Sequence, residues 1–250
     1  MLNNISQIFA LLNFNTLVYI TVGLRGSGAP PMEIFHTPNH FPAEVSHNHD
    51  MTYELLTALT AFGFVATITP GPNNLMLMAS GANFGFRRTI PHMAGVNIGF
   101  TVMVLLIGIG IKQLFDAYPN SYEVLKYFSI GYLLYLAYRI MTAAEAPKAD
   151  ETGRRPFSFL QAAAFQWVNP KAWTMALTAT AIYSPSRTLE SIALVALVFG
   201  LINLPCITVW TAMGQQISRF LTSSRRLKAF NFLMAALLVG SLYPVLFSNG

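Results

Sequence analysis

The side chains best placed to do chemistry in this sequence are polar groups inside long apolar stretches. Lys171, which follows Pro170, is the only formal charge well inside such a stretch. In a membrane, an isolated cation at this depth costs about 3 kcal/mol on insertion scales, so its ammonium group must face a cavity, backbone carbonyls or a partner. Two interpretations remain open: the ammonium group binds an anionic ligand, or it neutralises the carbonyls that Pro170 frees. A titrating lysine that carries a proton is a third hypothesis.

Two proline motifs interrupt apolar stretches that otherwise have helical character. The first covers residues 69–74 (Thr-Pro-Gly-Pro-Asn-Asn), and the second covers residues 169–171 (Asn-Pro-Lys). Proline lacks a backbone N–H and clashes with the carbonyl four residues earlier. Within lipid, the freed groups must be satisfied by protein or by a water-filled cavity. Helices that begin after the prolines would direct N–H groups and positive dipole ends at an anion, whereas simple kinks are the alternative.

Further polar side chains on neighbouring stretches complete the candidate site. Gln166, Asn169 and Trp173 recur at i, i+3 and i+7, so they share one helical face if the break is mild. Asn97 and Asn203 lie inside two other stretches, and each either faces a cavity or bonds to a neighbouring helix. The candidate substrate-binding residues are Pro70, Gly71, Pro72, Asn73, Asn74, Asn97, Gln166, Asn169, Pro170, Lys171, Trp173 and Asn203.

The composition identifies the elements that must position these groups as membrane helices. The chain has 250 residues, of which 54% are hydrophobic and only 10% charged, against about 25% charged in ordinary soluble domains. A soluble surface cannot be covered with so few charges, and disorder is excluded because so apolar a chain cannot stay solvated. The single cysteine, Cys206, excludes an intrachain disulfide. Nucleic-acid binding is also excluded, since no basic stripe is present.

Six stretches are long enough to span a bilayer, which requires roughly 20 mostly apolar residues. They cover about residues 55–84, 91–111, 124–143, 157–182, 190–213 and 229–247. Three spans in each half would place the halves in opposite orientations, with a broken helix in spans 1 and 4. This predicts an all-α integral membrane protein built as two inverted three-helix repeats, in which a substrate site lies at the broken helices.

The basic residues predict the orientation of these spans. The first, third and fifth loops and their flanks hold ten Lys and Arg residues, against three in the second and fourth. Basic loops stay in the cytoplasm, so both ends of the six-helix core should face outward. The pairs Gly95/Gly99 and Gly81/Gly85 have the spacing of close helix packing, and such glycine faces would permit a homodimer.

Residues 1–50 differ in composition from the rest of the chain. The stretch 5–22 is apolar but contains Asn13 and Asn15, and no basic residue precedes it, so it makes a marginal seventh span and a poor signal peptide. Residues 25–50 are rich in Pro, His and Asn, and Met51 would make a natural start of translation. We therefore expect 1–50 to be a disordered or mistakenly assigned extension whose deletion leaves function intact.

An enzyme at membrane depth would need a nucleophile with a base, or a metal cluster. Glu54, Glu123 and Glu190 fall at the ends of spans, and His92 is expected to lie at the membrane interface. The other four histidines fall within residues 36–49, with spacing that matches no structural metal site. We expect no catalytic residue, no metal and no cofactor.

Several motifs resemble the LysE/RhtB family of amino-acid exporters. They are residues 69–74, 80–88 (Ser-Gly-Ala-Asn-Phe-Gly-Phe-Arg-Arg), 95–99 (Gly-Val-Asn-Ile-Gly) and 167–172 (Trp-Val-Asn-Pro-Lys-Ala). The resemblance covers about residues 51–247 and implies that 51–250 form a six-helix LysE-type transporter domain. It further implies export of amino acids or their derivatives across a bacterial inner membrane, driven by the proton or membrane potential. Some relatives carry an acid where this chain has Asn73 or Asn74, so a cationic substrate and a carboxylate proton carrier at this motif are not implied.

The leading hypothesis is a multi-pass exporter of small, mostly neutral amino acids or derivatives in the bacterial inner membrane. Its partners would be the amino-acid substrate, the lipid bilayer and protons as coupling ion. An exporter or channel for another small solute, including a metal ion, is the alternative on the same fold. A cation path would carry acidic rings, and Lys171 repels cations. An intramembrane enzyme is the third hypothesis.

Overall fold

The computed structural model describes residues 53–111, 113, 117–118, 120–142, 155–184, 186 and 188–243, and the predicted extension at 1–50 lies outside them. Every regular element within these ranges is helical, as the all-α prediction requires. In chain order they are α3 (Tyr53–Ile68), α4 (Pro72–Phe84), α5 (Phe86–Leu106), the π-helical turn η1 (Ile107–Ile111), α7 (Asn120–Thr142), α8 (Phe159–Phe165), the 3₁₀ turn η3 (Gln166–Val168), α9 (Pro170–Tyr183), α10 (Leu189–Ser218) and α11 (Ser224–Gly240).

Both proline motifs break helices where the sequence predicts. The axes of α3 and α4 differ by 53° across the first break. Helix α4 begins at Pro72, a residue well suited to the first turn because its missing N–H would have no helical partner there. At the second break Asn169 is extended, with φ −94° and ψ 107°, and α9 begins at Pro170. The helix N-termini predicted at the two motifs are therefore confirmed.

Two helices of the described residues are long and apolar enough to cross a membrane, namely residues 86–111 (α5 with η1) and α10. The bent pair α3 and α4 meets the same requirement if it is counted as one span. The other predicted stretches are covered by α7, α8–α9 and α11. These helices do not meet the length and hydropathy requirement for a membrane span. The structure therefore confirms apolar helices of membrane-spanning character, and the six-span arrangement remains a prediction.

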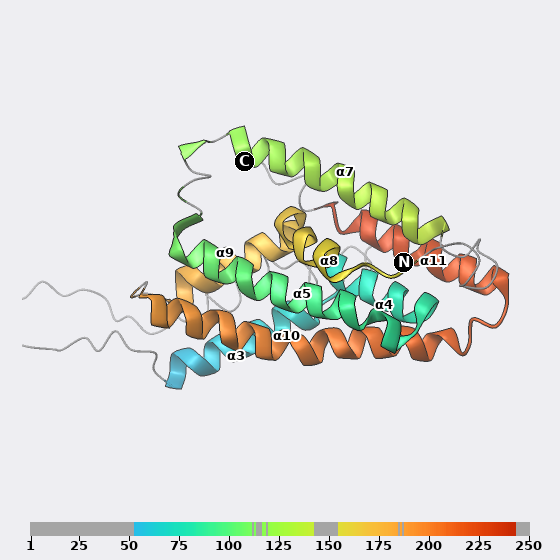
Figure 1. The fold of residues 1–250 in the computed structure, drawn as a ribbon, viewed down its shortest axis with the longest axis horizontal. Coiled ribbons are helices and arrows are strands. Elements are labelled where there is room, and N and C mark those ends of the chain that lie inside the picture. The colour runs from blue at the N-terminus through green and yellow to red at the C-terminus, as the bar shows by residue number, and fades with distance from the viewer. Residues whose placement is uncertain are drawn as a thin grey trace, which may run out of the picture. The chain divides into compact units, whose positions relative to one another are not determined.

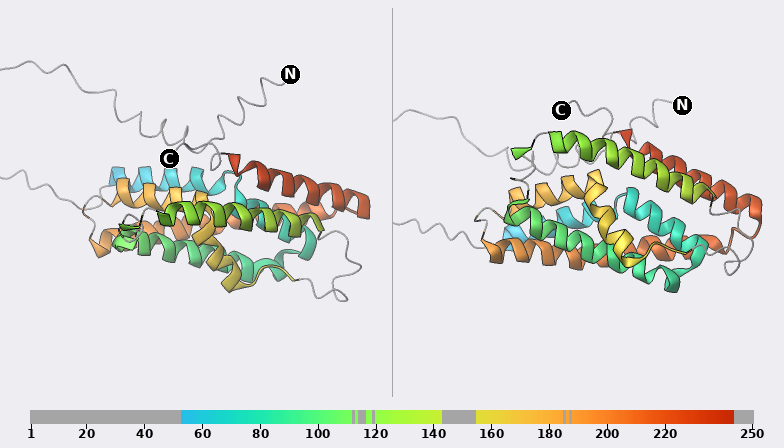
Figure 2. Two further views of the ribbon diagram at one scale, coloured as in Figure 1. Left: turned by 90° about the horizontal axis from the view of Figure 1, so that it is seen from above. Right: turned by 45° about the horizontal axis from the view of Figure 1, so that its top comes forward.

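The helices pack as a central bundle with a peripheral pair (Figure 1). In the centre, α10 packs against α3, α4 and α5, and the short α8 packs across α5. Helices α7 and α11 contact each other along one flank, as both views of Figure 2 show. Their core is a cluster of apolar side chains that includes Leu133, Leu136, Met234 and Leu238. At the two breaks Gly71 and Asn169 are buried, whereas Pro70 is exposed.

Glycines allow the closest helix contacts. A Cβ atom on Gly81 would collide with the carbonyl oxygen of Thr211, and one on Gly214 would collide with that of Met78, so α4 and α10 meet backbone to backbone. On α5, a Cβ on Gly99 would lie 2.6 Å from the Cα of Ala163 on α8. The prediction for Gly85 is wrong: no atom lies within 4 Å of its Cβ position, and its φ of 79° makes it the turn between α4 and α5.

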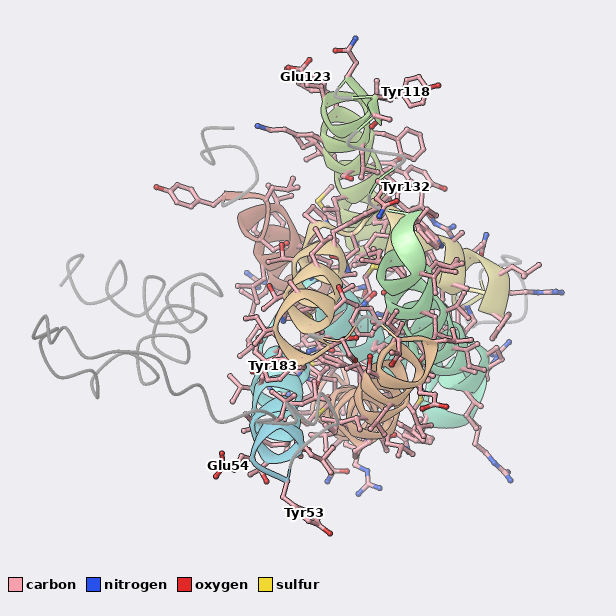
Figure 3. The ribbon with its side chains drawn as sticks, turned by 90° about the vertical axis from the view of Figure 1, so that its left-hand side faces the viewer. Tyr53, Glu54, Tyr118, Glu123, Tyr132 and Tyr183 are labelled. Carbon is pink, nitrogen blue, oxygen red and sulfur yellow. The ribbon has the colours of Figure 1, made fainter. Side chains whose placement is uncertain are left out.

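The two ends of the bundle differ in charge. The N-terminal turns of α5 and α11 carry Arg87, Arg88, Arg225 and Arg226, all exposed, at the right-hand end of Figure 1, which we call the basic end. The N-terminal turns of α3, α7 and α10 instead carry acidic residues. Figure 3, which faces the opposite end, shows Glu54 and Glu123 on its periphery. This asymmetry agrees with the predicted orientation, in which the basic end faces the cytoplasm.

Candidate functional site

The first break is held together by a side chain from the helix that follows it. Asn74 Nδ2 donates to the carbonyl oxygens of Thr67 at 2.7 Å and Thr69 at 2.8 Å, which the α3 helix leaves without backbone partners. Trp210 of α10 donates its indole N–H to the carbonyl oxygen of Ile68 at 3.0 Å. These bonds satisfy the carbonyls that a break inside a membrane protein would otherwise leave exposed.

The second break is ordered by Asn169. Its side-chain oxygen accepts a hydrogen bond from the backbone N–H of Lys171 at 3.2 Å and so caps the N-terminus of α9. Because Asn169 is extended, the helical phase is not continuous from η3 into α9. The indole N–H of Trp173 donates to the carbonyl oxygen of Trp167 at 2.8 Å.

Lys171 joins the two breaks. Its Nζ donates to the carbonyl oxygen of Thr69 at 2.8 Å, to the Thr69 hydroxyl at 2.9 Å and to the carbonyl oxygen of Pro70 at 3.4 Å. The ammonium group therefore rests on carbonyls of the first break, rather than on those that Pro170 frees. The lysine stem also passes close to Gly71, where a Cβ atom would lie 2.7 Å from Lys171 Cδ. A larger residue at position 71 would therefore require the lysine side chain to shift.

A cavity lies where the two breaks meet. Its volume is about 30 Å³, which suffices for water but is far below the roughly 300–1,000 Å³ of small-molecule sites. A substrate would therefore require the lining residues to move apart. None of the described residues that line it is acidic, and Lys171 is the cation among them. The lining residues are Ala66, Thr67, Gly71, Asn73, Asn74, Phe100, Asn169, Lys171, Ala172, Met175 and Asn203.

Two pairs of amide side chains each join a residue that lines the cavity to a residue that does not. Asn73 and Gln166 bond reciprocally, with Asn73 Nδ2 donating to Gln166 Oε1 at 2.9 Å and Gln166 Nε2 donating to Asn73 Oδ1 at 3.2 Å. Asn203 Nδ2 on α10 donates to Asn97 Oδ1 on α5 at 3.0 Å. Each pair joins a helix of the first half of the chain to one of the second. For Asn203 the two predicted roles coincide, because it lines the cavity and bonds to a neighbouring helix.

The predicted site residues fall into four groups. Six line the cavity: Gly71, Asn73, Asn74, Asn169, Lys171 and Asn203. Asn97 and Gln166 do not line the cavity but form hydrogen bonds with residues that do. Pro70, Pro72 and Pro170 determine the backbone conformation at the breaks. Trp173 is buried but does not line the cavity.

Several residues that line the cavity were not predicted from the sequence. Thr67, Phe100 and Met175 line the cavity, yet the first looks like an ordinary helical threonine and the other two like ordinary apolar residues. Thr69 belongs to the first proline motif, and only the structure shows that it is the main acceptor for Lys171. A signal was available for Thr69, because carbonyl and hydroxyl groups next to a break are natural partners for a buried cation.

Comparison with known proteins identifies the family. Residues 64–241 match the family model described as LysE type translocator. The chain belongs to this family. It is 31% identical over 193 residues to the cysteine/O-acetylserine efflux protein of Salmonella choleraesuis (strain SC-B67), covering 76% of this chain and 96% of that protein. The efflux proteins of the same name from Escherichia coli (strain K12) and Shigella sonnei (strain Ss046) are each 29% identical over 192 residues, with the same coverage. No solved structure matches.

Membership of the LysE type translocators settles the broad class of activity. The chain is a membrane transport protein for a small molecule rather than an enzyme. The family match includes both breaks and every residue that lines the cavity. In the part of the chain that the structure describes, no group of three or more His, Cys, Asp or Glu side chains is arranged to hold a metal ion.

Proposed function

We propose that this LysE type translocator exports small neutral amino acids or their O-acyl derivatives, of which cysteine and O-acetylserine are examples. The relatives at about 30% identity bear the names of these two solutes. The observation that carries the proposal is the cavity between the two broken helices, which is lined by uncharged amide groups and one cation. A zwitterion needs donors for its carboxylate and acceptors for its ammonium group, and this lining offers both.

The carboxylate of the substrate would bind beside Lys171 and the N-terminus of α4. No side chain caps that helix end, so its N–H groups and positive dipole favour an anion. Lys171 adds a full positive charge at the same place. The side-chain oxygens of Asn73 and Asn203 would accept hydrogen bonds from the substrate ammonium group. With no acid among the described lining residues, a cationic amino acid would lack a counterion.

The proposal includes the membrane arrangement. We propose six crossings in two inverted three-helix repeats within a bacterial inner membrane, with the basic end in the cytoplasm. The packing supports the repeat, because the first half of broken span 1, α3, packs against α10, and the first half of broken span 4, α8, packs against the corresponding helix α5. Proton motive force would drive export, and a homodimer is compatible with the long exposed apolar faces of the helices.

The test is efflux from bacterial cells that express the full chain and are loaded with dipeptides. We expect selective release of one or two neutral amino acids or derivatives, which stops when an uncoupler collapses the proton gradient. The double variant Asn73→Ala and Asn74→Ala should lose this release while its amount in the membrane is unchanged. Asn83→Ala is the matched control, because Asn83 is on the same helix but bonds to Asn231 outside the cavity. Selective release of another solute, or of a metal ion, would contradict the proposal.

A further inference from the structure

One buried polar group has no role in the site described above. His92 on α5 is 1% exposed, and neither ring nitrogen has a hydrogen-bond partner. Its ring contacts the ring of Phe157, just before α8, with centroids 5.3 Å apart. His92 is therefore buried within the protein near the start of α5, and its expected position at the membrane interface stays a prediction. An unpaired buried polar group costs about 1–3 kcal/mol, and such groups are rare enough in folded proteins that each needs a reason.

His92 belongs to a layer that separates the cavity from the basic end. The layer, which we call the inner cluster, contains Leu77, Met93, Val96, Ala162 and Ile207, with Phe86 and Phe157 packed against it. On α4, α5 and α10 the order is the same: the cavity residues Asn74, Phe100 and Asn203 come first, then residues of the inner cluster, and then the basic end. Helix α8 carries Ala162 of the inner cluster and is joined through η3 to the cavity residue Asn169. Along α4, α5 and α10, the inner cluster therefore lies between the cavity and the basic end.

Of the elements that form the inner cluster, α8 is the shortest and the best suited to move as a unit. It has only seven residues, and it is joined to α9 through the 3₁₀ turn η3 and the extended Asn169. A short 3₁₀ stretch next to a break is a common hinge. Helix α8 packs closely on α5 at Gly95 and Gly99, as α4 packs on α10 at Gly81 and Gly214, so its short length and its connection through η3 are what distinguish it.

A latch connects this hinge to the cavity. Gln166, at the start of η3, is fully buried and donates through Nε2 both to the carbonyl oxygen of Ala162 on α8 and to Asn73 on the cavity wall. A ligand that takes the Asn73 amide for its own hydrogen bonds removes the partner that holds Gln166, and with it η3 at the end of α8, against α4. Ligand in the cavity and the position of α8 are thereby linked.

We propose that α8 is the inner gate of the transport path, that the Asn73–Gln166 pair is its latch, and that His92 lines the opened path. Swinging α8 away from α5 about η3 separates Phe157 from His92 and admits water to the imidazole. This explains why a polar ring without partners is placed in an apolar layer: its hydrogen bonds are made in the open state. The proposal rests on the proposed function only in placing a solute in the cavity.

The single native cysteine makes the gate directly testable by thiol labelling. In a Cys206→Ser background, which keeps an acceptor for the Thr67 hydroxyl, His92→Cys is compared with Met103→Cys. Met103 is on the same helix, is 0% exposed and lies outside the inner cluster. In inside-out vesicles, we expect a membrane-impermeant maleimide to label His92→Cys at least about tenfold faster, a difference of about 1.4 kcal/mol. Equal protection of both cysteines in a variant that still transports would overturn the gate.

A second measurement leaves His92 in place. Diethyl pyrocarbonate modifies accessible imidazoles, and peptide mass spectrometry of the full chain resolves His92 from the four other histidines. Gln166→Leu removes the latch, so we expect faster modification of His92 than in the unaltered chain. Thr180→Val is the control, because the Thr180 hydroxyl bonds only within α9. An unchanged rate in Gln166→Leu would overturn the latch.

These labelling experiments separate failure of the gate from failure of the proposed function. They do not depend on the identity of the exported solute. Faster labelling in Gln166→Leu, together with no amino-acid release from cells, would support the gate and contradict amino-acid export. Amino-acid release together with complete protection of His92 would support amino-acid export and contradict the gate.

Discussion

Lys171 at the second helix break donates hydrogen bonds to Thr69 at the first, across 102 positions of sequence. The cation of one half of the chain thus satisfies carbonyl and hydroxyl oxygens that the break in the other half exposes. This contact closes one side of the cavity and places a positive charge beside the N-terminus of α4. The breaks are therefore one structural unit, and a change at either should affect both.

Replacing Lys171 tests this unit. Lys171→Ala should lower efflux at least about tenfold, because hydrogen bonds to a charged group contribute about 1.5–3 kcal/mol and the Thr69 and Pro70 oxygens would lose them. The measurement is efflux per amount of protein in the membrane.

Lys171→Arg separates the remaining roles of this side chain. Arginine stays charged, so full proton-coupled transport in this variant would exclude a titrating lysine as the proton carrier. We expect partial activity, since the guanidinium group retains the charge but the stem has no spare room beside Gly71. Unchanged efflux in Lys171→Ala would remove the residue from the site altogether.

Local features of the fold were predictable from the sequence, and the reason is physical. Pro72 and Pro170 break helices through their own covalent structure, so the break positions follow from two residues without knowledge of tertiary contacts. Apolar stretches likewise locate the helices in 53–111, 120–142 and 155–243. Six of the twelve predicted residues line the observed cavity, and their role in substrate binding stays a prediction.

What the sequence could not provide were pairings between distant helices. Gln166 looked like a cavity residue, but its amide is taken up by Asn73. His92 looked interfacial from its place near the end of a span, and only the structure shows that its ring is buried against Phe157. The glycine spacing of 81 and 85 equally suited packing, although only Gly81 meets another helix. In each case the partner lies far away in sequence and leaves no local pattern.

The reciprocal amide pair should show measurable coupling. Asn73→Ala and Gln166→Ala each leave the other amide without its partner, so the double variant should lose less stability than the sum of the two single variants. Interhelical pairs in membrane proteins couple by about 0.6 kcal/mol on average and up to about 1.7. We expect the upper part of that range, because two bonds are made. The free energy of unfolding in mixed micelles measures it, and strict additivity would show that the pair does not hold η3 against α4.

The backbone contact between α4 and α10 should be intolerant of a single methyl group. Gly81→Ala would press a Cβ into the Thr211 carbonyl oxygen, and overpacking of this kind costs about 1–3 kcal/mol. Gly131→Ala is the control, because Gly131 is exposed inside α7 with no atom within 4 Å of its Cβ position. It should be neutral or raise stability by up to about 1 kcal/mol. Equal thermal stability of the two variants in detergent would show that α4 and α10 are not fixed as described.

Variants of two buried asparagines can distinguish a role in substrate binding from a role in holding helices together. Asn203 and Asn231 are both buried and each bonds to an asparagine on another helix, but only Asn203 lines the cavity. Asn203→Ala and Asn231→Ala remove the same atoms, but the first loses one interhelical bond and the second loses two, so Asn231→Ala should destabilise the protein at least as much. Efflux should differ: Asn203→Ala raises the substrate concentration needed for half-maximal transport, because an acceptor for the ammonium group is gone, while Asn231→Ala leaves it unchanged. Initial rates in inside-out vesicles, measured over a range of O-acetylserine concentrations, would show this. Parallel changes in both variants would mean that Asn203 serves only to join α5 and α10.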